Sequence, residues 1–143
     1  MANDNILISL EHRHAENILA GNKRVELRRR AIRVEPGTII WMYSKLPKGL
    51  IVGSATVVRL RQASPASLWR RYGRETGITR SEFFEYFSAT GNGFALELSG
   101  STRLKEPVSL KALREVDKSF QPPQFFKRLH PSEEILKAVS SAI

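Results

Sequence analysis

The sequence predicts an α+β domain in which a small curled β-barrel is surrounded by helices. Segments with the composition of β-strands outnumber segments with a helical pattern, and Gly53 interrupts a long strand-like run where a barrel would bend. The chain has 143 residues and a mass of 16.2 kDa, which suits one domain, and it contains no internal repeat or long linker. We therefore expect residues 1–143 to form a single domain.

The first third of the chain predicts a strand, a helix and a second strand. Residues 6–10 are a compact apolar run, and residues 13–20 place apolar side chains on one helical face. Gly21 suits the left-handed residue that follows a helix. Residues 23–28 then alternate between charged and apolar side chains, which predicts a half-buried strand with one charged side.

The middle of the chain predicts two strands and two helices. Residues 38–43 and 50–60 are rich in β-branched and apolar side chains, as strands are. Ser64 and the proline after it suit the start of a helix that ends near Gly73. A second helix is expected from Thr79, where Thr-Arg-Ser-Glu matches a capping box. Its four aromatic residues are expected to pack against the barrel, with one tyrosine as the candidate for a different role.

The last third predicts a hairpin followed by mostly irregular chain. After a Gly-Asn-Gly turn, residues 94–98 are expected to pair with residues 101–105. Residues 108–114 suit a short helical turn. Residues 119–127 are expected to be irregular because two consecutive prolines exclude helix and sheet, and residues 132–143 suit a closing helix.

The charge of the chain favours a polyanionic ligand. Twenty-three Lys and Arg residues against fourteen Asp and Glu give a formal net charge of +9 and a sequence pI near 10.4. Such a surface attracts nucleic acid or an anionic membrane, although basic proteins without either partner also exist. The N-terminal segment lacks the features of a signal peptide, and no apolar run approaches the ~20 residues of a membrane span. We expect a cytoplasmic protein without membrane contact.

Neither a metal ion nor another cofactor is expected. The chain has no cysteine, and its histidines, His12, His14 and His130, do not have metal-site spacing. The first two could serve as acid–base groups because histidine titrates near neutrality. Their place on the first helix favours surface residues instead.

The most informative segment is residues 21–33, in which one acid, Glu26, lies among basic residues. On a strand, Glu26 could form an ion pair with Arg24 or Arg28 on the same face. It could instead accept hydrogen bonds from the edge of a base, or stabilise a reacting group. The residues alone leave both interpretations open.

The spacing Gly21-x-Lys23-x-x-Glu26-x-Arg28 resembles the GxKxxExR signature of the ASCH domain family, whose fold is PUA-like. The segments ILISLEHRHAENILAGNK and WMYSKLPKGLIVGSATV are similar to the first strand and helix of that family and to its next hairpin. GITRSEFFEYF, GFALEL and PPQFF are similar to later segments of a longer bacterial and archaeal subgroup. The resemblance extends from residue 6 to about residue 129.

This resemblance implies a PUA-like β-barrel with a cleft that binds RNA or a nucleotide-like ligand, and some family members are hydrolases. One branch resembles amidohydrolases that act on N4-acetylcytidine with a lysine, a threonine and a distant glutamate. Lys23 matches the lysine, Glu26 stands where the threonine is expected, and Glu75 lies in the region of the distant glutamate. Other relatives have been proposed to cut RNA.

We expect a basic cleft that holds phosphate on Lys23 and Arg28 and a base edge on Glu26, with an aromatic ring stacked on the base. The expected ligand-binding residues are Lys23, Glu26, Arg28, Arg29, Arg30, Tyr43, Ser44, Tyr86, Gln124 and Phe125. Structural alternatives are a solubility face for the arginines and a core position for Tyr43. Ser44 has no evident neighbouring base that would make it a nucleophile.

Two other functions stay open. A hydrolase acting on RNA or on a modified nucleoside would use Lys23 as a catalytic amine and Glu26 or Glu75 as the general acid–base. A sensor that binds a small nucleotide and contacts a protein partner is the third hypothesis, and the sequence shows no long apolar stripe for such a partner.

Overall fold

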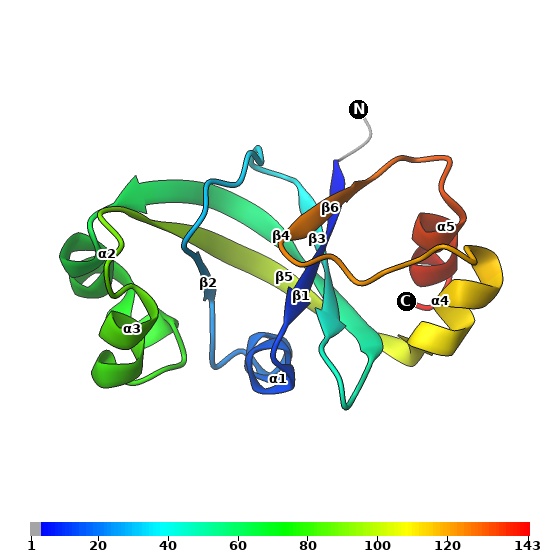
Figure 1. Ribbon diagram of the computed structural model, residues 1–143, viewed down its shortest axis with the longest axis horizontal. Coiled ribbons are helices and arrows are strands. Elements are labelled where there is room, and N and C mark those ends of the chain that lie inside the picture. Colours follow the sequence, from blue (N-terminus) through cyan, green and yellow to red (C-terminus); the bar gives the residue numbers. More distant parts are fainter. Residues whose placement is uncertain (1–3) are drawn as a thin grey trace.

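The computed structural model describes residues 4–143, and these form six strands and five α-helices (Figure 1). The strands are β1 (Asn5–Leu10), β2 (Val25–Arg28), β3 (Ile39–Ser44), β4 (Leu50–Ala63), β5 (Gly93–Ser109) and β6 (Phe126–Leu129). The helices are α1 (His12–Ala20), α2 (Pro65–Tyr72), α3 (Arg80–Tyr86), α4 (Leu110–Val116) and α5 (Glu134–Ser140), with a 3-10 turn, η1, at Gly73–Glu75. The α+β class expected from the sequence is confirmed.

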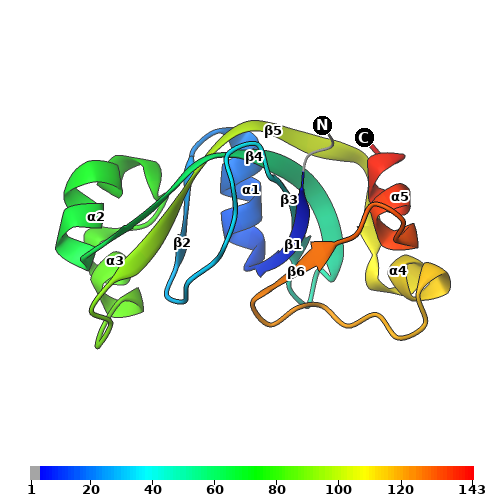
Figure 2. The same cartoon turned by 90° about the horizontal axis from the view of Figure 1, so that it is seen from above.

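All six strands belong to one curled sheet, in the order β2-β5-β4-β3-β1-β6. β1 and β3 are parallel, and the other neighbours are antiparallel. β4 and β5 are the longest strands, and together they cross most of the molecule in both views (Figures 1 and 2). Because β2 and β6 lie at the two edges of the described sheet, the predicted barrel is a half-barrel.

Gly53 marks an irregularity in β4, as expected. The pairing of β4 with β5 shifts register between Ile51 and Gly53. A Cβ atom at this glycine would lie 2.5 Å from the carbonyl oxygen of Thr102 and 2.6 Å from a methyl group of Leu19. The close approach of β5 and α1 therefore requires glycine here.

The expected hairpin at residues 94–105 is wrong, because β5 is one continuous strand. Gly100 has a φ of 58°, which resembles a turn, but Ser99 and Thr102 on either side of it both pair with β4. β4 supplies partners on both sides of Gly100, so the bend does not reverse the chain. The expected irregular segment is also shorter, since residues from Phe126 onward pair with β1 as β6.

The helix starts agree with the sequence, with one difference that bears on function. Ser64 and Thr79 accept hydrogen bonds from the backbone of Ser67 and Glu82. The Glu82 carboxylate, however, bonds to Arg13 on α1, so the expected capping box is only half formed. The α-helices span seven to nine residues. Within residues 4–143 none has the length and apolar character that a membrane crossing requires.

Three apolar clusters hold the helices on the sheet. One includes Ile18 of α1, a second packs α4 and α5, and the third packs α2 and α3 against β2 and β5. Phe83 and Phe87 are buried in the third cluster, as expected. In Figures 1 and 2, α1 lies between β2 and the β1–β3 pair. The short strand β2 therefore has α1 on one flank and α3 on the other.

Candidate functional site

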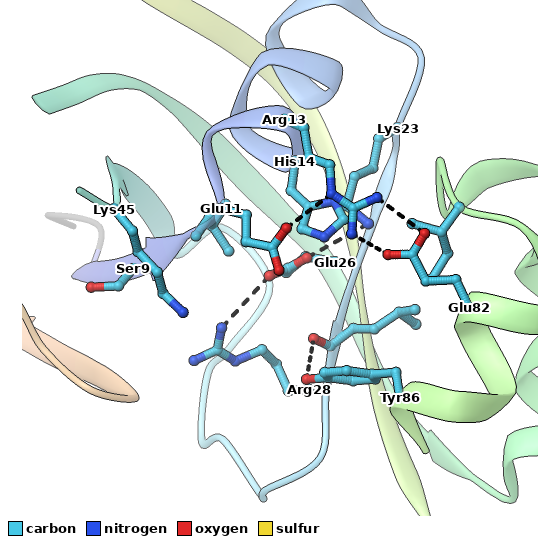
Figure 3. A pocket seen from close by; sticks show the side chains of 13 residues that line it. Ser9, Glu11, Arg13, His14, Lys23, Glu26, Arg28, Lys45, Glu82 and Tyr86 are labelled. Carbon is cyan, nitrogen blue, oxygen red and sulfur yellow. Dashed lines mark hydrogen bonds and ion pairs between the residues drawn. The ribbon is translucent and has the colours of Figure 1, made fainter. Parts of the chain in front are cut away.

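A cavity of about 140 Å³ lies among α1, β2, α3 and the end of β1 (Figure 3). It exists because α1 and α3 pack beside β2 without closing over its polar side. Its lining residues are Ser9, Leu10, Glu11, Arg13, His14, Lys23, Glu26, Leu27, Arg28, Lys45, Ile78, Glu82 and Tyr86. We call this cavity the motif pocket, because three residues of the GxKxxExR pattern line it.

Glu26 lies in the motif pocket between two cations. Its Oε1 is 3.6 Å from Nζ of Lys23, and its Oε2 is 3.6 Å from Nη1 of Arg28. Both distances exceed an ordinary hydrogen bond, so the carboxylate keeps acceptor capacity for a ligand. Lys23 is only 2% exposed and Glu26 only 5%. Lys23 and Glu26 are therefore shielded from solvent inside the pocket, which the alternation of residues 23–28 did not predict.

The side chain of Lys23 is held by a backbone carbonyl group and is shielded from solvent. Its ammonium group donates a 2.6 Å hydrogen bond to the carbonyl oxygen of Thr76. Burial lowers the pKa of Lys23 below its ordinary value of 10.5, because desolvation disfavours the ammonium form, while the charge of Glu26 opposes this shift. The pocket thus holds an amine that gives up its proton more readily than a surface lysine.

Arg13 connects both sides of the pocket mouth. Its guanidinium group donates to Glu11 at 2.9 Å and, through Nη1, to Glu82 at 3.0 Å, and a second, Nη2 contact makes the Glu82 pair bidentate. The three side chains are partly exposed. This network joins α1 to α3 in front of the buried Lys23 (Figure 3), so a ligand entering the pocket would pass beside it.

His14 also lines the motif pocket, which contradicts the expectation of a surface histidine. It is half-buried, and its Nδ1 is buried without a hydrogen-bond partner among the described residues. Burial lowers its pKa below 6.5, and the positive charge of Lys23 lowers it further. At neutral pH the imidazole is therefore mostly uncharged, with one nitrogen able to accept a proton or a hydrogen bond.

A wider groove of about 720 Å³ adjoins the pocket and shares Ser9, Arg28, Lys45 and Tyr86 with it. The other residues of its lining are Arg29, Arg30, Ala31, Ile32, Gln124, Phe125 and Phe126. We call it the basic groove. It brings the arginine run beside the Pro-Pro segment, although the two lie about a hundred residues apart in the sequence.

Aromatic rings hold the arginines of the basic groove in place. The guanidinium carbon of Arg29 lies 4.7 Å from the ring centroid of Tyr86, and that of Arg30 lies 4.1 Å from the ring centroid of Phe125. Arg28 donates a 2.6 Å hydrogen bond to the carbonyl oxygen of Phe125. These contacts leave guanidinium donors available for an anion, since no carboxylate within residues 4–143 pairs with Arg29 or Arg30.

Tyr43 and Gln124 line a third hollow next to the basic groove, together with Ser9, Lys45 and three further residues. Tyr43 is 2% exposed and its ring belongs to an apolar cluster. Its hydroxyl group is buried without a hydrogen-bond partner within the described chain. Tyr43 is therefore a core residue that also borders a hollow. The sequence had suggested a core position and a ligand-binding position as alternatives, and the structure combines a core position with a place beside a hollow.

Ser44 and Glu75, two of the expected site residues, lie elsewhere. Ser44 is fully buried and lines no described cavity, and its hydroxyl group lies 3.1 Å from Nδ1 of His12. The neighbouring base that the sequence did not reveal thus exists, but no substrate can reach the hydroxyl. Glu75 is exposed on η1 and lines a different hollow beside α2, whereas Lys23 lines the motif pocket.

Sequence reasoning missed Arg13, His14, Lys45, Glu82 and Ser9 as parts of the site. None carries a local signal: Glu82 matched a capping box, and His14 lay two residues from another histidine on a predicted surface helix. Their role follows from the packing of α1 against α3, which no short motif encodes. The remaining expected residues meet at the motif pocket, the basic groove or the hollow of Tyr43.

Comparison with known proteins gives the chain a family. A family model described as a domain of unknown function, DUF365, matches residues 5–120. A curated protein of Zymomonas mobilis, the ASCH domain-containing ribonuclease, is 34% identical over 134 residues, which are 94% of this chain and 89% of that protein. The crystal structure of ASCH from Zymomonas mobilis superposes with a TM-score of 0.89 at 33% identity, covering 95% of this chain and 94% of that one.

More distant structures share the fold alone. Human THYN1, solved in complex with DNA containing 5-methylcytosine, has a TM-score of 0.60 at 12% identity and covers 98% of both chains. The N-terminal domain of Staphylothermus marinus McrB has a TM-score of 0.59 at 12% identity, covering 99% of this chain and 98% of that one. On the family match, the 34% identity and the superposition, this chain belongs to the DUF365 family and is an ASCH domain protein with a PUA-like fold.

Proposed function

We propose that the protein binds single-stranded RNA along the basic groove and admits one nucleotide into the motif pocket. The observation that carries this proposal is the position of Glu26, a buried carboxylate between Lys23 and Arg28 in a concave site that joins a groove lined with arginine. Open acceptor capacity beside fixed cations suits a ligand that carries both amino groups and phosphates. Nucleotides have this chemistry.

Phosphate groups would lie on the cations of the basic groove. Arg29 and Arg30 are exposed, are oriented by aromatic rings and lack carboxylate partners in the described chain. Arg28 and Lys45 line both cavities and would hold the phosphate at the junction. Phe125, which is 42% exposed, offers a ring on which a base can stack. An RNA ligand also agrees with the expected cytoplasmic location.

Base recognition would depend on Glu26. A carboxylate accepts hydrogen bonds from an exocyclic amino group, so cytosine, adenine or guanine would fit better than uracil. The cavity of about 140 Å³ is small, which suits a single base or its polar edge. The nucleotide would enter past the Arg13 network at the mouth.

One observation favours a second, catalytic function. The relative that is 34% identical over 94% of this chain is named a ribonuclease. In RNA cleavage without a metal ion, the 2′-oxygen attacks the adjacent phosphorus, and the bond from phosphorus to the 5′-oxygen breaks, which leaves a 2′,3′-cyclic phosphate. A general base takes the proton of the 2′-hydroxyl group, and a water molecule gives a proton to the departing 5′-oxygen. Neutral His14, which lines the motif pocket and has a lowered pKa, is suited to take that first proton. Arg28 and Lys45 would stabilise the negative charge that develops on the phosphate.

Both functions can be tested with one labelled RNA of twelve nucleotides. Fluorescence anisotropy with a 2′-O-methyl version measures binding without cleavage, and a denaturing gel with the unmodified RNA measures cleavage. We expect wild-type protein to bind and cut, Arg28→Gln to lose at least tenfold in affinity, and His14→Gln to bind but not cut. Failure of the wild-type protein to bind either RNA at low salt would refute the proposal. Binding without cleavage in wild type would refute only the catalytic part.

A further inference from the structure

A further hollow lies against α2 and η1, apart from the motif pocket and the basic groove. It has a volume of about 520 Å³, and α2 forms the outer end of the molecule on this side (Figure 1). Its lining residues are Trp69, Arg70, Arg71, Gly73, Arg74 and Glu75. We call it the α2 hollow. Four of these six residues carry a charge, and three of the charges are positive.

The three arginines of the α2 hollow lack acidic partners. Arg70 donates to the hydroxyl group of Ser67 at 3.2 Å, and Arg71 lies over the ring of Tyr72 at 5.7 Å. No carboxylate lies within 4.0 Å of any of the three guanidinium groups in the described part of the chain. Some exposed arginines elsewhere do have such a partner: Arg103, for example, pairs with Glu16 at 2.9 Å. The α2 hollow therefore carries a net positive charge, and no ion pair within residues 4–143 engages its three arginines.

Trp69 gives the same hollow a fixed aromatic surface. Its ring centroid lies 5.1 Å from that of Phe83 and 6.2 Å from that of Phe84. A Cβ atom at Gly73 would approach the indole to 3.0 Å, so the glycine lets the ring lie against the backbone of η1. The indole is only half-buried and borders the hollow. A held aromatic ring beside free guanidinium groups is the usual composition of a site for single-stranded nucleic acid.

A short segment connects the α2 hollow to the motif pocket. Glu75 lines the hollow and Ile78 lines the pocket, and three peptide units keep their Cα atoms within about 11 Å of each other. The hydrogen bond from Lys23 to the carbonyl oxygen of Thr76 fixes this segment to the floor of the pocket. One strand of a few nucleotides could therefore reach both cavities.

We propose that the α2 hollow is a second binding site for the same RNA strand, with phosphates on Arg70, Arg71 and Arg74 and a base on Trp69. This inference rests on the proposed function, because it assigns the path of an RNA that enters the motif pocket. The strand leaves the pocket, passes α3 and continues onto the hollow. Glu75, the one acid of the hollow, faces this strand and weakens its binding.

The test compares two triple variants that both lower the formal net charge from +9 to +6. One is Arg70→Gln, Arg71→Gln, Arg74→Gln. The matched control is Lys105→Gln, Lys111→Gln, Lys118→Gln, which removes exposed charges at and around α4, at the opposite end of the molecule (Figure 1). Binding of 2′-O-methyl RNAs of four and twelve nucleotides is measured from 50 to 300 mM salt.

For the twelve-nucleotide RNA, we expect the arginine triple to lose roughly tenfold or more in affinity. The slope of log K against log salt should decrease in magnitude by about 2, near 0.7 for each lost phosphate contact. The control triple should keep the wild-type slope and lose less than threefold. Both variants should bind the four-nucleotide RNA within about twofold of wild type, because that RNA fills only the motif pocket and the basic groove. Arg74→Gln alone, which breaks no side-chain hydrogen bond, ion pair or ring contact within residues 4–143, should lose about threefold in affinity.

A gain of affinity provides a second readout that misfolding cannot produce. Glu75→Gln should tighten binding of the twelve-nucleotide RNA about threefold, while the charge-matched Glu115→Gln on α4 should leave it unchanged. Equal losses in the two triples, or equal effects of the two glutamate variants, would mean that only net charge matters and would overturn the second site. If Arg28→Gln weakens both RNAs while the arginine triple weakens neither, the proposed function stands and the second site fails. If wild type binds neither RNA, both proposals fail.

Discussion

The ammonium group of Lys23 lies 3.6 Å from Oε1 of Glu26, and both side chains are almost completely shielded from solvent. Bringing two charges out of water is costly, and the cost is tolerated only when each charge stays compensated. Here Thr76 and Arg28 complete the compensation. The pair is therefore a poor means of stabilising a fold and a good means of presenting fixed charges to a ligand.

Removing the negative charge of this pair should destabilise the protein. In Glu26→Gln, Lys23 and Arg28 lose their shared counter-charge, and we expect the free energy of unfolding at pH 7 to fall by about 3 kcal/mol. The double variant Lys23→Met, Glu26→Gln should recover most of this loss because it leaves no buried unpaired ammonium. Urea denaturation measures both. A double variant no more stable than Glu26→Gln would show that the two charges do not depend on each other.

The lowered pKa of His14 predicts how stability depends on pH. Folding lowers this pKa below 6.5, so below that value the unfolded chain binds more protons than the folded chain, and the free energy of unfolding rises as pH rises toward 6.5. One histidine contributes at most about 1.4 kcal/mol per pH unit to this slope. For His14→Gln, the free energy of unfolding should depend less steeply on pH than for wild type below pH 6.5. Parallel curves for the two proteins from urea titrations would contradict the buried position of the imidazole.

Glu82 should restrain RNA binding without adding much stability. Its ion pair with Arg13 is partly exposed, so Glu82→Gln should change the free energy of unfolding by less than about 1 kcal/mol. The same change removes a negative charge from the mouth of the motif pocket and frees Arg13, and we expect RNA affinity to increase two- to fivefold. Glu16→Gln is the matched control, because Glu16 pairs with Arg103 away from the pocket. Equal RNA affinities for the two variants would show that Glu82 at the mouth of the motif pocket does not affect RNA binding.

Arg29 and Arg30 should set the salt dependence of binding. Replacing both with glutamine should reduce the slope of log K against log salt by about 1.4, since each arginine is assigned one phosphate of a single strand. Lys111→Gln together with Lys118→Gln removes the same charge near α4 and should leave the slope unchanged. If the arginine pair keeps the wild-type slope, the basic groove does not hold the RNA backbone.

Much of the fold follows from local sequence, because its signals act over a few residues. Gly21, Ser64 and Thr79 mark helix ends by their own backbone and side-chain chemistry, and all three appear where expected. The exception is β5, where Gly100 resembles a turn and only the length of the distant partner β4 decides that the strand continues. The pairing of strands in the sheet depends on residues far apart in the sequence, so a short segment does not predict it.

The candidate site also combines residues that a local motif predicts with residues that only tertiary packing brings together. Lys23, Glu26 and Arg28 were predictable because they belong to one spaced motif on one strand. His14, Arg13 and Glu82 were not, because they reach the pocket only through the packing of α1 and α3 on either side of β2. The burial of Ser44 was not predictable for a related reason: it ends a strand, but only the packing of α1 on that strand places its hydroxyl group beside His12.

The proposed function requires RNA to occupy the motif pocket and the basic groove. The most direct test is a nuclear magnetic resonance titration of the isotope-labelled protein with a short 2′-O-methyl RNA. We predict that backbone amide signals of residues 9–14, 23–30, 78–86 and 124–126 shift on binding, while those of α4 and α5 stay in place. Saturable binding with shifts confined to α4 and α5, or no shift at millimolar RNA, would contradict the account.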